Sequence, residues 1–367
     1  MATSILFSPY NLGSIDLKNR MVMAPMTRSR AIGNIPDDLI AEYYAQRSDA
    51  GLIITEGTSP SPDGLGYPRI PGLFSKEQVE GWKKTTKAVH DKGGKIFAQL
   101  MHTGRIGHHD NLPSGARIVA PSEIKAAGQM YTDQNGMQDH PVPHALTLEE
   151  IEKVKLEFVN AAKNAIEAGF DGIELHSANG YLLEQFIHPD TNKRTDTYGG
   201  SIENRTRFVM EIAKAVADSI GKDKVGIRVS PYGVFNDLSL YADIIPTYSH
   251  IAKELNKIGI TYIHVVDHSA QGAPEVKQAV KDSIRQNFKG TYILSGGYTK
   301  ESAENDLQAN KGDLVAFGVK YLSNPDLVDR FKNDELLNAD IKFDKFYTSG
   351  PEGFTDYPTI QEVHLKI

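Results

Sequence analysis

Eight short, nearly continuous apolar runs recur along this chain, and they restrict its fold more than any other feature. Amphipathic segments with helical spacing separate most of them. Uninterrupted apolar runs of this length are typical of parallel strands that helices cover on both faces. The pattern therefore predicts an α/β protein built as a single (β/α)8 TIM barrel. The predicted strands are residues 21–26, 51–57, 95–101, 172–177, 225–230, 262–267, 292–297 and 314–318, and the predicted helices are 38–50, 76–92, 147–168, 204–220, 241–258 and 299–310.

A doubly wound open sheet is the main alternative fold. It usually has fewer strands, and it carries a glycine-rich fingerprint between a strand and a helix to bind its cofactor. The chain contains neither G-x-G-x-x-G nor G-x-x-x-x-G-K-[ST]. We therefore expect one barrel domain that spans residues 1–367.

One insertion interrupts the regular spacing of the predicted strands. Residues 103–145 separate the third run from the fourth, are rich in Gly, Pro, His and polar residues, and show no helical period. Loops that follow barrel strands open on the carboxyl-terminal face, so we expect this third loop to form a lid over that face. We also expect the first 20 residues to plug the opposite end and residues 343–367 to wrap back over the barrel.

Composition excludes several classes of function. With 40 Lys and Arg against 47 Asp and Glu, the net charge is −7, so the chain has no basic excess for nucleic acid. The absence of cysteine rules out disulfides, iron–sulfur clusters, zinc–thiolate sites and cysteine nucleophiles. Neither a secretory signal nor a long apolar span is evident, so we expect a cytoplasmic protein that does not contact membranes.

The residues at the ends of the predicted strands indicate the kind of site. In this fold, chemistry is assembled where strands end at the carboxyl-terminal face. Glycines at the last two strand ends suit a phosphate, because backbone amides can approach it closely. The other side chains suit a polar ring system rather than a metal ion, which would need several converging carboxylates or imidazoles. These strand-end residues are Thr27, Gly57, Gln99, His176, Arg228, Asp267, His268, Gly296, Gly297 and Gly318.

His176, Asn179 and Tyr181 form a compact group after the fourth predicted strand. If a turn begins there, His176 and Asn179 can donate hydrogen bonds to one oxygen, with the Tyr181 phenol nearby. The same residues would also serve as a strand-end cap with a core tyrosine. Spacing alone leaves both interpretations open.

Over residues 6–359 the chain resembles the Old Yellow Enzyme family of flavin-dependent ene-reductases, and most closely its bacterial and fungal members. The resemblance rests on many motifs in the same order. They include M-A-P-M-T-R at 23–28, H-T-G-R at 102–105, E-L-H-S-A-N-G-Y at 174–181 and N-P-D-L at 324–327.

The resemblance implies a non-covalent FMN at the barrel mouth, with NADPH or NADH as hydride donor. It implies reduction of small electrophilic alkenes, which are α,β-unsaturated carbonyls, maleimides or nitroalkenes, by a monomer or homodimer. His176 and Asn179 would bind the substrate oxygen and Tyr181 would protonate the α-carbon. The implied FMN-binding residues are Pro25, Met26, Thr27, Gly57, Gln99, Arg228, Gly296, Gly297, Gly318 and Val319. Tyr67, Met101 and Tyr347 would line the substrate cavity together with His176 and Asn179.

Three positions depart from the family pattern. Met101 stands where many relatives have tryptophan, and Asn179 stands where close bacterial relatives have a second histidine. Val319 occupies the position of the arginine that usually holds the FMN phosphate, so we expect weaker retention of FMN unless Lys320 or backbone amides compensate.

Two other classes of function are disfavoured. A metal-dependent barrel hydrolase would carry His-x-His on the first strand, which ends in Ala24-Pro25-Met26-Thr27 instead. We therefore expect no metal. An inactive flavoprotein would lack His176 or Tyr181, and both are present.

Overall fold

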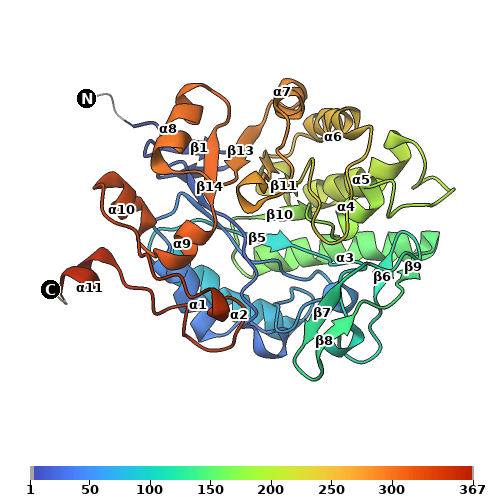
Figure 1. The fold of residues 1–367 in the computed structure, drawn as a ribbon, viewed down its shortest axis with the longest axis horizontal. Coiled ribbons are helices and arrows are strands. Elements are labelled where there is room, and N and C mark those ends of the chain that lie inside the picture. Colours follow the sequence, from blue (N-terminus) through green and yellow to red (C-terminus); the bar gives the residue numbers. More distant parts are fainter. Residues whose placement is uncertain (1–3, 366–367) are drawn as a thin grey trace.

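A closed barrel of eight parallel strands forms the centre of the computed structural model, which describes residues 4–365 (Figure 1). The barrel closes in the order β10-β11-β12-β13-β14-β3-β4-β5, and helices surround it. The predicted (β/α)8 architecture is therefore confirmed. The barrel strands are β3 (Met21–Met23), β4 (Leu52–Ile54), β5 (Ile96–Leu100), β10 (Gly172–Ser177), β11 (Val225–Val229), β12 (Tyr262–Val265), β13 (Thr291–Ser295) and β14 (Leu314–Phe317).

Most of the strands end earlier than the apolar runs that predicted them. The β3 ladder, for example, continues only as far as the amide of Ala24, which donates to the carbonyl of Phe317 at 3.0 Å. Pro25 follows and has no N–H to donate, so the chain leaves the sheet there. The ends of the apolar runs consequently turn into the barrel mouth, where Pro25, Met26 and Thr27 become available to a ligand.

All six predicted helices are present. Two begin with capping boxes, in which Ser75 and Thr147 accept hydrogen bonds from the amides of Gln78 and Glu150. Five further helices were not predicted, because they are short or mostly polar. The predicted helices are α1 (Asp38–Gln46), α2 (Lys76–His90), α3 (Leu148–Glu167), α5 (Ile202–Ile220), α6 (Ile244–Ile258) and α8 (Lys300–Gln308), and the others are α4 (Leu182–Ile187), α7 (Gln278–Asn287), α9 (Val319–Ser323), α10 (Leu327–Lys332) and α11 (Ile360–His364).

A hairpin closes the amino-terminal end of the barrel. Its strands are β1 (Tyr10–Leu12) and β2 (Ile15–Leu17). Leu12 and Leu17 are fully buried and join the apolar cluster that fills the barrel, which also contains Phe97 and Tyr262. The predicted plug is therefore present, and it leaves the carboxyl-terminal end as the open mouth.

The insertion at residues 103–145 folds into small sheets outside the barrel. Strands β6 (Val119–Ala120) and β9 (His144–Ala145) pair in parallel, and β7 (Gln129–Thr132) and β8 (Gly136–Asp139) form an antiparallel hairpin (Figure 1). Residues of this hairpin line a cavity described below. A moving lid remains a prediction.

Two buried arginines fasten the C-terminal region to the segment that follows β3. Arg28 donates to the carbonyls of Phe346 and Gly353, at 3.2 and 2.6 Å. Arg30 donates to four carbonyls between residues 345 and 352, at 2.9 to 3.0 Å. Charged donors form strong hydrogen bonds, so this clamp fixes the path of residues 345–353 beside the mouth.

No helix within residues 4–365 has the length and apolar character needed to cross a membrane.

Candidate active site

A buried carboxylate organises the floor of the barrel mouth. Glu174 on β10 accepts a hydrogen bond from Gln99 Nε2 on β5 at 2.8 Å, and its other oxygen lies 2.9 Å from His264 Nδ1 on β12. All three side chains are essentially inaccessible to solvent. Because Gln99 Nε2 points to Glu174, its Oε1 is the atom left free to accept a hydrogen bond from a ligand.

His176 and Arg228 lie side by side immediately above Glu174. They are register partners on β10 and β11, and both are buried. His176 Nδ1 and Arg228 Nε are buried atoms that find no hydrogen-bond partner within residues 4–365. Burial and the nearby Arg228 charge hold the pKa of His176 well below its usual value, so the imidazole is neutral. Two such atoms stand side by side at the barrel mouth, where a ligand could bond to them.

The turn after β10 is held by a second buried carboxyl group. Glu184 accepts a hydrogen bond from the amide of Gly180 at 2.7 Å and from the hydroxyls of Ser230 and Tyr248. Burial raises its pKa to about 7. The turn needs this support because Asn179 has a φ of 59°, in the left-handed region that side chains rarely adopt.

Tyr181 immediately precedes α4 and faces both His176 and Tyr67. Its hydroxyl lies 3.0 Å from that of Tyr67, and its ring centre lies 5.1 Å from that of His176. Burial raises the pKa of Tyr181 above its usual value of about 10, so the phenol carries its proton at neutral pH. Residues 67 and 181 are far apart in sequence, and their pairing could not be read from the chain.

A cavity of about 390 Å³ gathers most of the residues predicted to bind the cofactor. Gly296 and Gly297 have φ values of 122° and 66°, which favour glycine, and a Cβ at Gly296 would lie 2.4 Å from the carbonyl oxygen of Asp267. The wall is therefore backbone rather than side chain at this end. The predicted residues that line this cavity are Pro25, Met26, Asn179, Arg228, Gly296, Gly297, Gly318 and Val319.

A second cavity, of about 760 Å³, is lined by four more of the predicted site residues. Thr27, Tyr67 and Tyr181 line it, together with Tyr347 from the clamped C-terminal region. Met130 and Tyr131 of the β7–β8 hairpin contribute another side. The two cavities contain neighbouring residues of the same segment, because Met26 lines the first and Thr27 the second.

Four predicted site residues line neither cavity wall. Gln99, Met101, His176 and Gly57 are all buried. A Cβ at Gly57 would lie 2.4 Å from Met101 Sδ, so the glycine makes room for the methionine. Met101 in turn belongs to the apolar cluster that Tyr67 and Tyr181 pack against, so it supports these rings from behind.

One lysine lines the first cavity at the end beside α9. Val319 begins α9, and the neighbouring Lys320 also lines the cavity. Burial lowers the pKa of Lys320, and no carboxylate in the described part of the chain pairs with it. Lys320 therefore provides a positive charge next to Val319, whose own side chain carries no charge.

The sequence patterns did not single out Glu174, His264 or Glu184, and they marked His268 only as one of the strand-end residues. A signal for Glu174 was available: it stands two residues before His176, and residues two apart in a strand share a face. His268 lies beside Asn179, with Nε2 3.0 Å from Asn179 Oδ1. That contact joins two different strand ends and has no local sequence signal.

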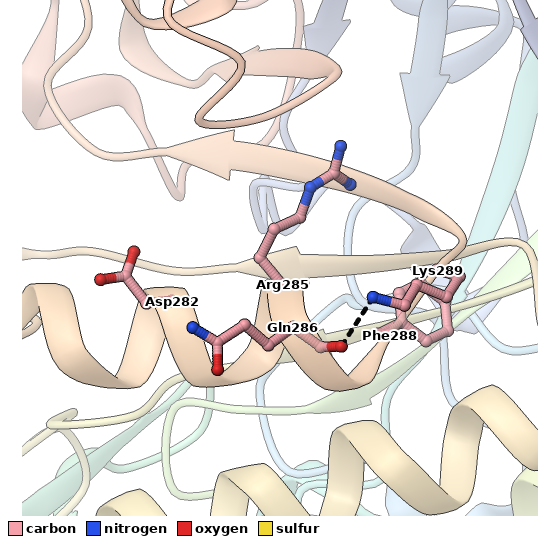
Figure 2. A pocket seen from close by; sticks show the side chains of 5 residues that line it. All are labelled: Asp282, Arg285, Gln286, Phe288 and Lys289. Atoms are coloured by element: carbon pink, nitrogen blue, oxygen red, sulfur yellow. Dashed lines mark hydrogen bonds between the residues drawn. The ribbon is translucent and has the colours of Figure 1, made fainter.

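A third hollow, of about 450 Å³, lies apart from these residues (Figure 2). It is lined by Asp282, Arg285, Gln286, Phe288 and Lys289, at the end of α7 that leads into β13, so it belongs to the amino-terminal side of the barrel. None of the predicted site residues is among them. Across residues 4–365 there is also no group of three or more His, Asp or Glu placed to hold a metal ion.

Comparison with known proteins gives consistent matches over nearly the whole chain. The model of the NADH:flavin oxidoreductase / NADH oxidase family matches residues 5–338. The chain is 40% identical to 12-oxophytodienoate reductase 7 of Oryza sativa subsp. japonica, covering 96% of this chain and 94% of that one. It is 41% identical to flavin oxidoreductase hxnT of Emericella nidulans, covering 97% and 98%.

Solved structures show the same likeness in three dimensions. Morphinone reductase superposes with a TM-score of 0.94 at 39% identity, over 99% of this chain and 98% of that one. A complex of morphinone reductase with tetrahydroNAD gives 0.92 at 40% identity, over 99% of both chains. The Old Yellow Enzyme homologue from Zymomonas mobilis gives 0.92 at 39% identity, over 96% and 99%.

Proposed function

Because this chain belongs to the NADH:flavin oxidoreductase / NADH oxidase family of Old Yellow Enzyme, and is therefore an FMN-dependent oxidoreductase, we propose that it reduces the activated C=C bond of α,β-unsaturated carbonyls, maleimides or nitroalkenes. NADPH or NADH supplies the hydride. The observation that carries the proposal is the contact between His176 and Tyr181 at the barrel mouth, next to buried polar atoms of His176 and Arg228 that have no partner within residues 4–365.

The residues at the mouth fit FMN. The unpartnered Nε of Arg228 and the free Oε1 of Gln99 offer a donor and an acceptor to a polar ring edge. The backbone at Gly318 leaves room for a phosphate, since a Cβ there would meet only Met26 Sδ, at 3.6 Å. When bound, FMN supplies the hydride-transfer chemistry that no side chain possesses.

Arg228 has a distinct role in this scheme. A guanidinium in a buried site stabilises negative charge that develops on a bound ring much more strongly than it would in water. Gln99, oriented by Glu174, would accept from a ring N–H, and the Thr27 hydroxyl would donate to a ring carbonyl. Together these groups would orient the ring system and favour its reduced, more negative form.

His176 and Asn179 bind the electron-withdrawing oxygen of the substrate. The neutral imidazole and the side-chain amide each donate a hydrogen bond, which draws electron density from the double bond and prepares its β-carbon to accept hydride. Tyr181 then gives its proton to the α-carbon. Tyr67 hydrogen-bonds the Tyr181 hydroxyl and lines the substrate cavity with Tyr347.

The direct test uses the purified holoprotein under anaerobic conditions. Flavin absorption should bleach on addition of NADPH or NADH and return on addition of 2-cyclohexenone, with formation of cyclohexanone. Bleaching that is reversed by oxygen but not by enones, maleimides or nitroalkenes would contradict the proposal. The protein would then be a flavin oxidoreductase that reduces some other acceptor.

A cation at position 319 should strengthen FMN binding. Val319→Arg places a guanidinium beside a glycine-lined cavity, where it can form charge-assisted hydrogen bonds with phosphate. We expect FMN to bind more tightly by about 1–3 kcal/mol, measured by fluorescence titration of the apoprotein. Val319→Leu is the matched control without charge. Equal affinities for both variants would show that Lys320 and the backbone amides already satisfy the phosphate.

A further inference from the structure

Asn179 is held in place on three sides. Its amide N–H donates to Ser230 Oγ at 2.8 Å, and its carbonyl accepts from Asn236 Nδ2 at 2.7 Å. Because the backbone is fixed in this way, the side-chain amide retains one important freedom, the rotation that exchanges Oδ1 and Nδ2. The third contact, from His268 Nε2 to Asn179 Oδ1 at 3.0 Å, acts directly on that rotation.

His268 follows β12 and lines the same cavity as Asn179 and Arg228. Its other ring nitrogen, Nδ1, lies 3.1 Å from Gln271 Oε1, and the Phe235 ring packs over it at 4.4 Å between centres. Burial, followed by the Arg228 charge, lowers the pKa of His268 to about 4. At neutral pH the imidazole therefore has one N–H for two amide neighbours.

The two amides differ in their freedom to turn. Gln271 is exposed, so its terminal group can rotate at little cost and donate its own N–H to Nδ1. The single imidazole proton then resides on Nε2 and donates to Asn179 Oδ1. With Oδ1 occupied, Asn179 Nδ2 is the atom that remains for a ligand, and no residue between 4 and 365 accepts from it.

We propose that His268 is a positioning residue that holds the Asn179 amide with its N–H group toward the substrate oxygen, and that Gln271 selects the imidazole tautomer that does so. This inference rests on the proposed function, because it assigns Asn179 to the substrate oxygen. Without His268 the amide can turn, and its oxygen would then face the substrate oxygen and repel it.

The test uses para-chlorophenol as the probe, because a phenolate oxygen should occupy the substrate-oxygen position and give a charge-transfer band with oxidised FMN. Dissociation constants are measured from that band in holoprotein at saturating FMN. His268→Leu removes the donor, and His268→Gln keeps one. We expect His268→Leu to weaken phenol binding about tenfold, as expected when a hydrogen bond to a charged oxygen is lost. We expect His268→Gln to stay within about threefold of the wild type.

A double-mutant cycle separates positioning from a general structural effect. Asn179→Ala should weaken binding about as much as His268→Leu, and the double variant should be no worse than either alone. Additive losses would overturn the inference, because His268 would then act independently of Asn179. An unchanged affinity in His268→Leu would also overturn it.

His176→Ala tells this failure apart from failure of the proposed function. If the proposed substrate-oxygen site is correct, the wild type shows the band and His176→Ala loses most of it, whatever His268 does. If the wild type shows no band, the proposed function is wrong, and the inference about His268 falls with it.

Discussion

Replacing Tyr181 with phenylalanine is expected to slow hydride transfer to a cyclic enone by about 10²–10⁴-fold, while reduction of the flavin by NADPH or NADH stays within a few-fold of wild type. Hydride transfer to an enone forms an enolate whose α-carbon must be protonated, whereas reduction of the flavin requires no proton from this side chain. Phenylalanine keeps the ring that packs against His176 and Tyr67 and deletes only the hydroxyl.

Stopped-flow measurement of each half-reaction provides the test. Tyr67→Phe is the matched control, because it removes the partner hydroxyl 3.0 Å away and keeps the proposed donor. Its enone half-reaction should slow much less than that of Tyr181→Phe. Nitroalkenes should also suffer less, because a nitronate is stable enough to leave and be protonated in water. Equal slowing of the two half-reactions in Tyr181→Phe would mean that Tyr181 has a structural role. An enone half-reaction as fast as that of the wild type would mean that water supplies the proton.

Acid should destabilise the fold below about pH 6.5, because six buried or half-buried histidines are held neutral. Burial lowers the pKa of each in the folded protein, to about 3 for His102 and about 4 for His268. An unfolded histidine has a pKa near 6.5, so below that pH the unfolded chain binds more protons and stability falls. The other four are His140, His176, His188 and His264.

Four buried carboxyl groups act in the opposite direction. Burial raises the pKa of Asp49, Glu56 and Glu184 to about 7, and it raises that of Glu157. Their stabilising contribution to the folded state is complete below a pH of about 4, which is the pKa of these groups in the unfolded chain. It is lost as the pH rises through about 7. The histidines outnumber them, so on balance the unfolded chain takes up protons on the acid side of neutral pH. Stability should therefore peak close to neutral pH and fall on the acid side, by about 1.4 kcal/mol per pH unit for each proton taken up on unfolding.

Urea unfolding of the holoprotein at several pH values between 5 and 8 measures this profile. His102→Asn is the informative variant, because Nδ1 of His102 accepts from the amide of Gly104 and an asparagine oxygen can take that bond. This variant lacks the titrating imidazole. On the acid side, its free energy of unfolding should therefore change less steeply with pH, by the amount that corresponds to about one proton. A slope unchanged from wild type would mean that His102 is not kept neutral by folding.

Much of the fold was predictable because a buried parallel barrel leaves a strong local signal. Each strand is an apolar run and each long helix is amphipathic, so the periodicity alone located them. The signal is absent for α7, which buries only Val280 and Ile284 on an otherwise polar helix. It is also absent for the sheets in residues 103–145, whose short strands alternate weakly or not at all.

The candidate site was predictable to a smaller extent. Strand ends and motifs identified the residues, such as Gln99 and Arg228, but not the contacts between them. Glu174 was overlooked although it shares a strand face with His176, because a carboxylate within an apolar run was taken as part of the strand. The Asn179–His268 contact joins the ends of β10 and β12, which lie on either side of β11, and only the closed barrel brings those two ends together.

The Arg28 and Arg30 clamp has a consequence for the biosynthesis of the protein. Both arginines bond to carbonyls between residues 345 and 353, which are synthesised 315 to 325 residues after them. Until those residues leave the ribosome, the two guanidinium groups lack most of the partners that they have in the folded protein, and the wall that carries Tyr347 does not exist. The barrel strands can pair before then, but the cavity beside Tyr347 is completed only when residues 345–353 reach the segment that follows β3.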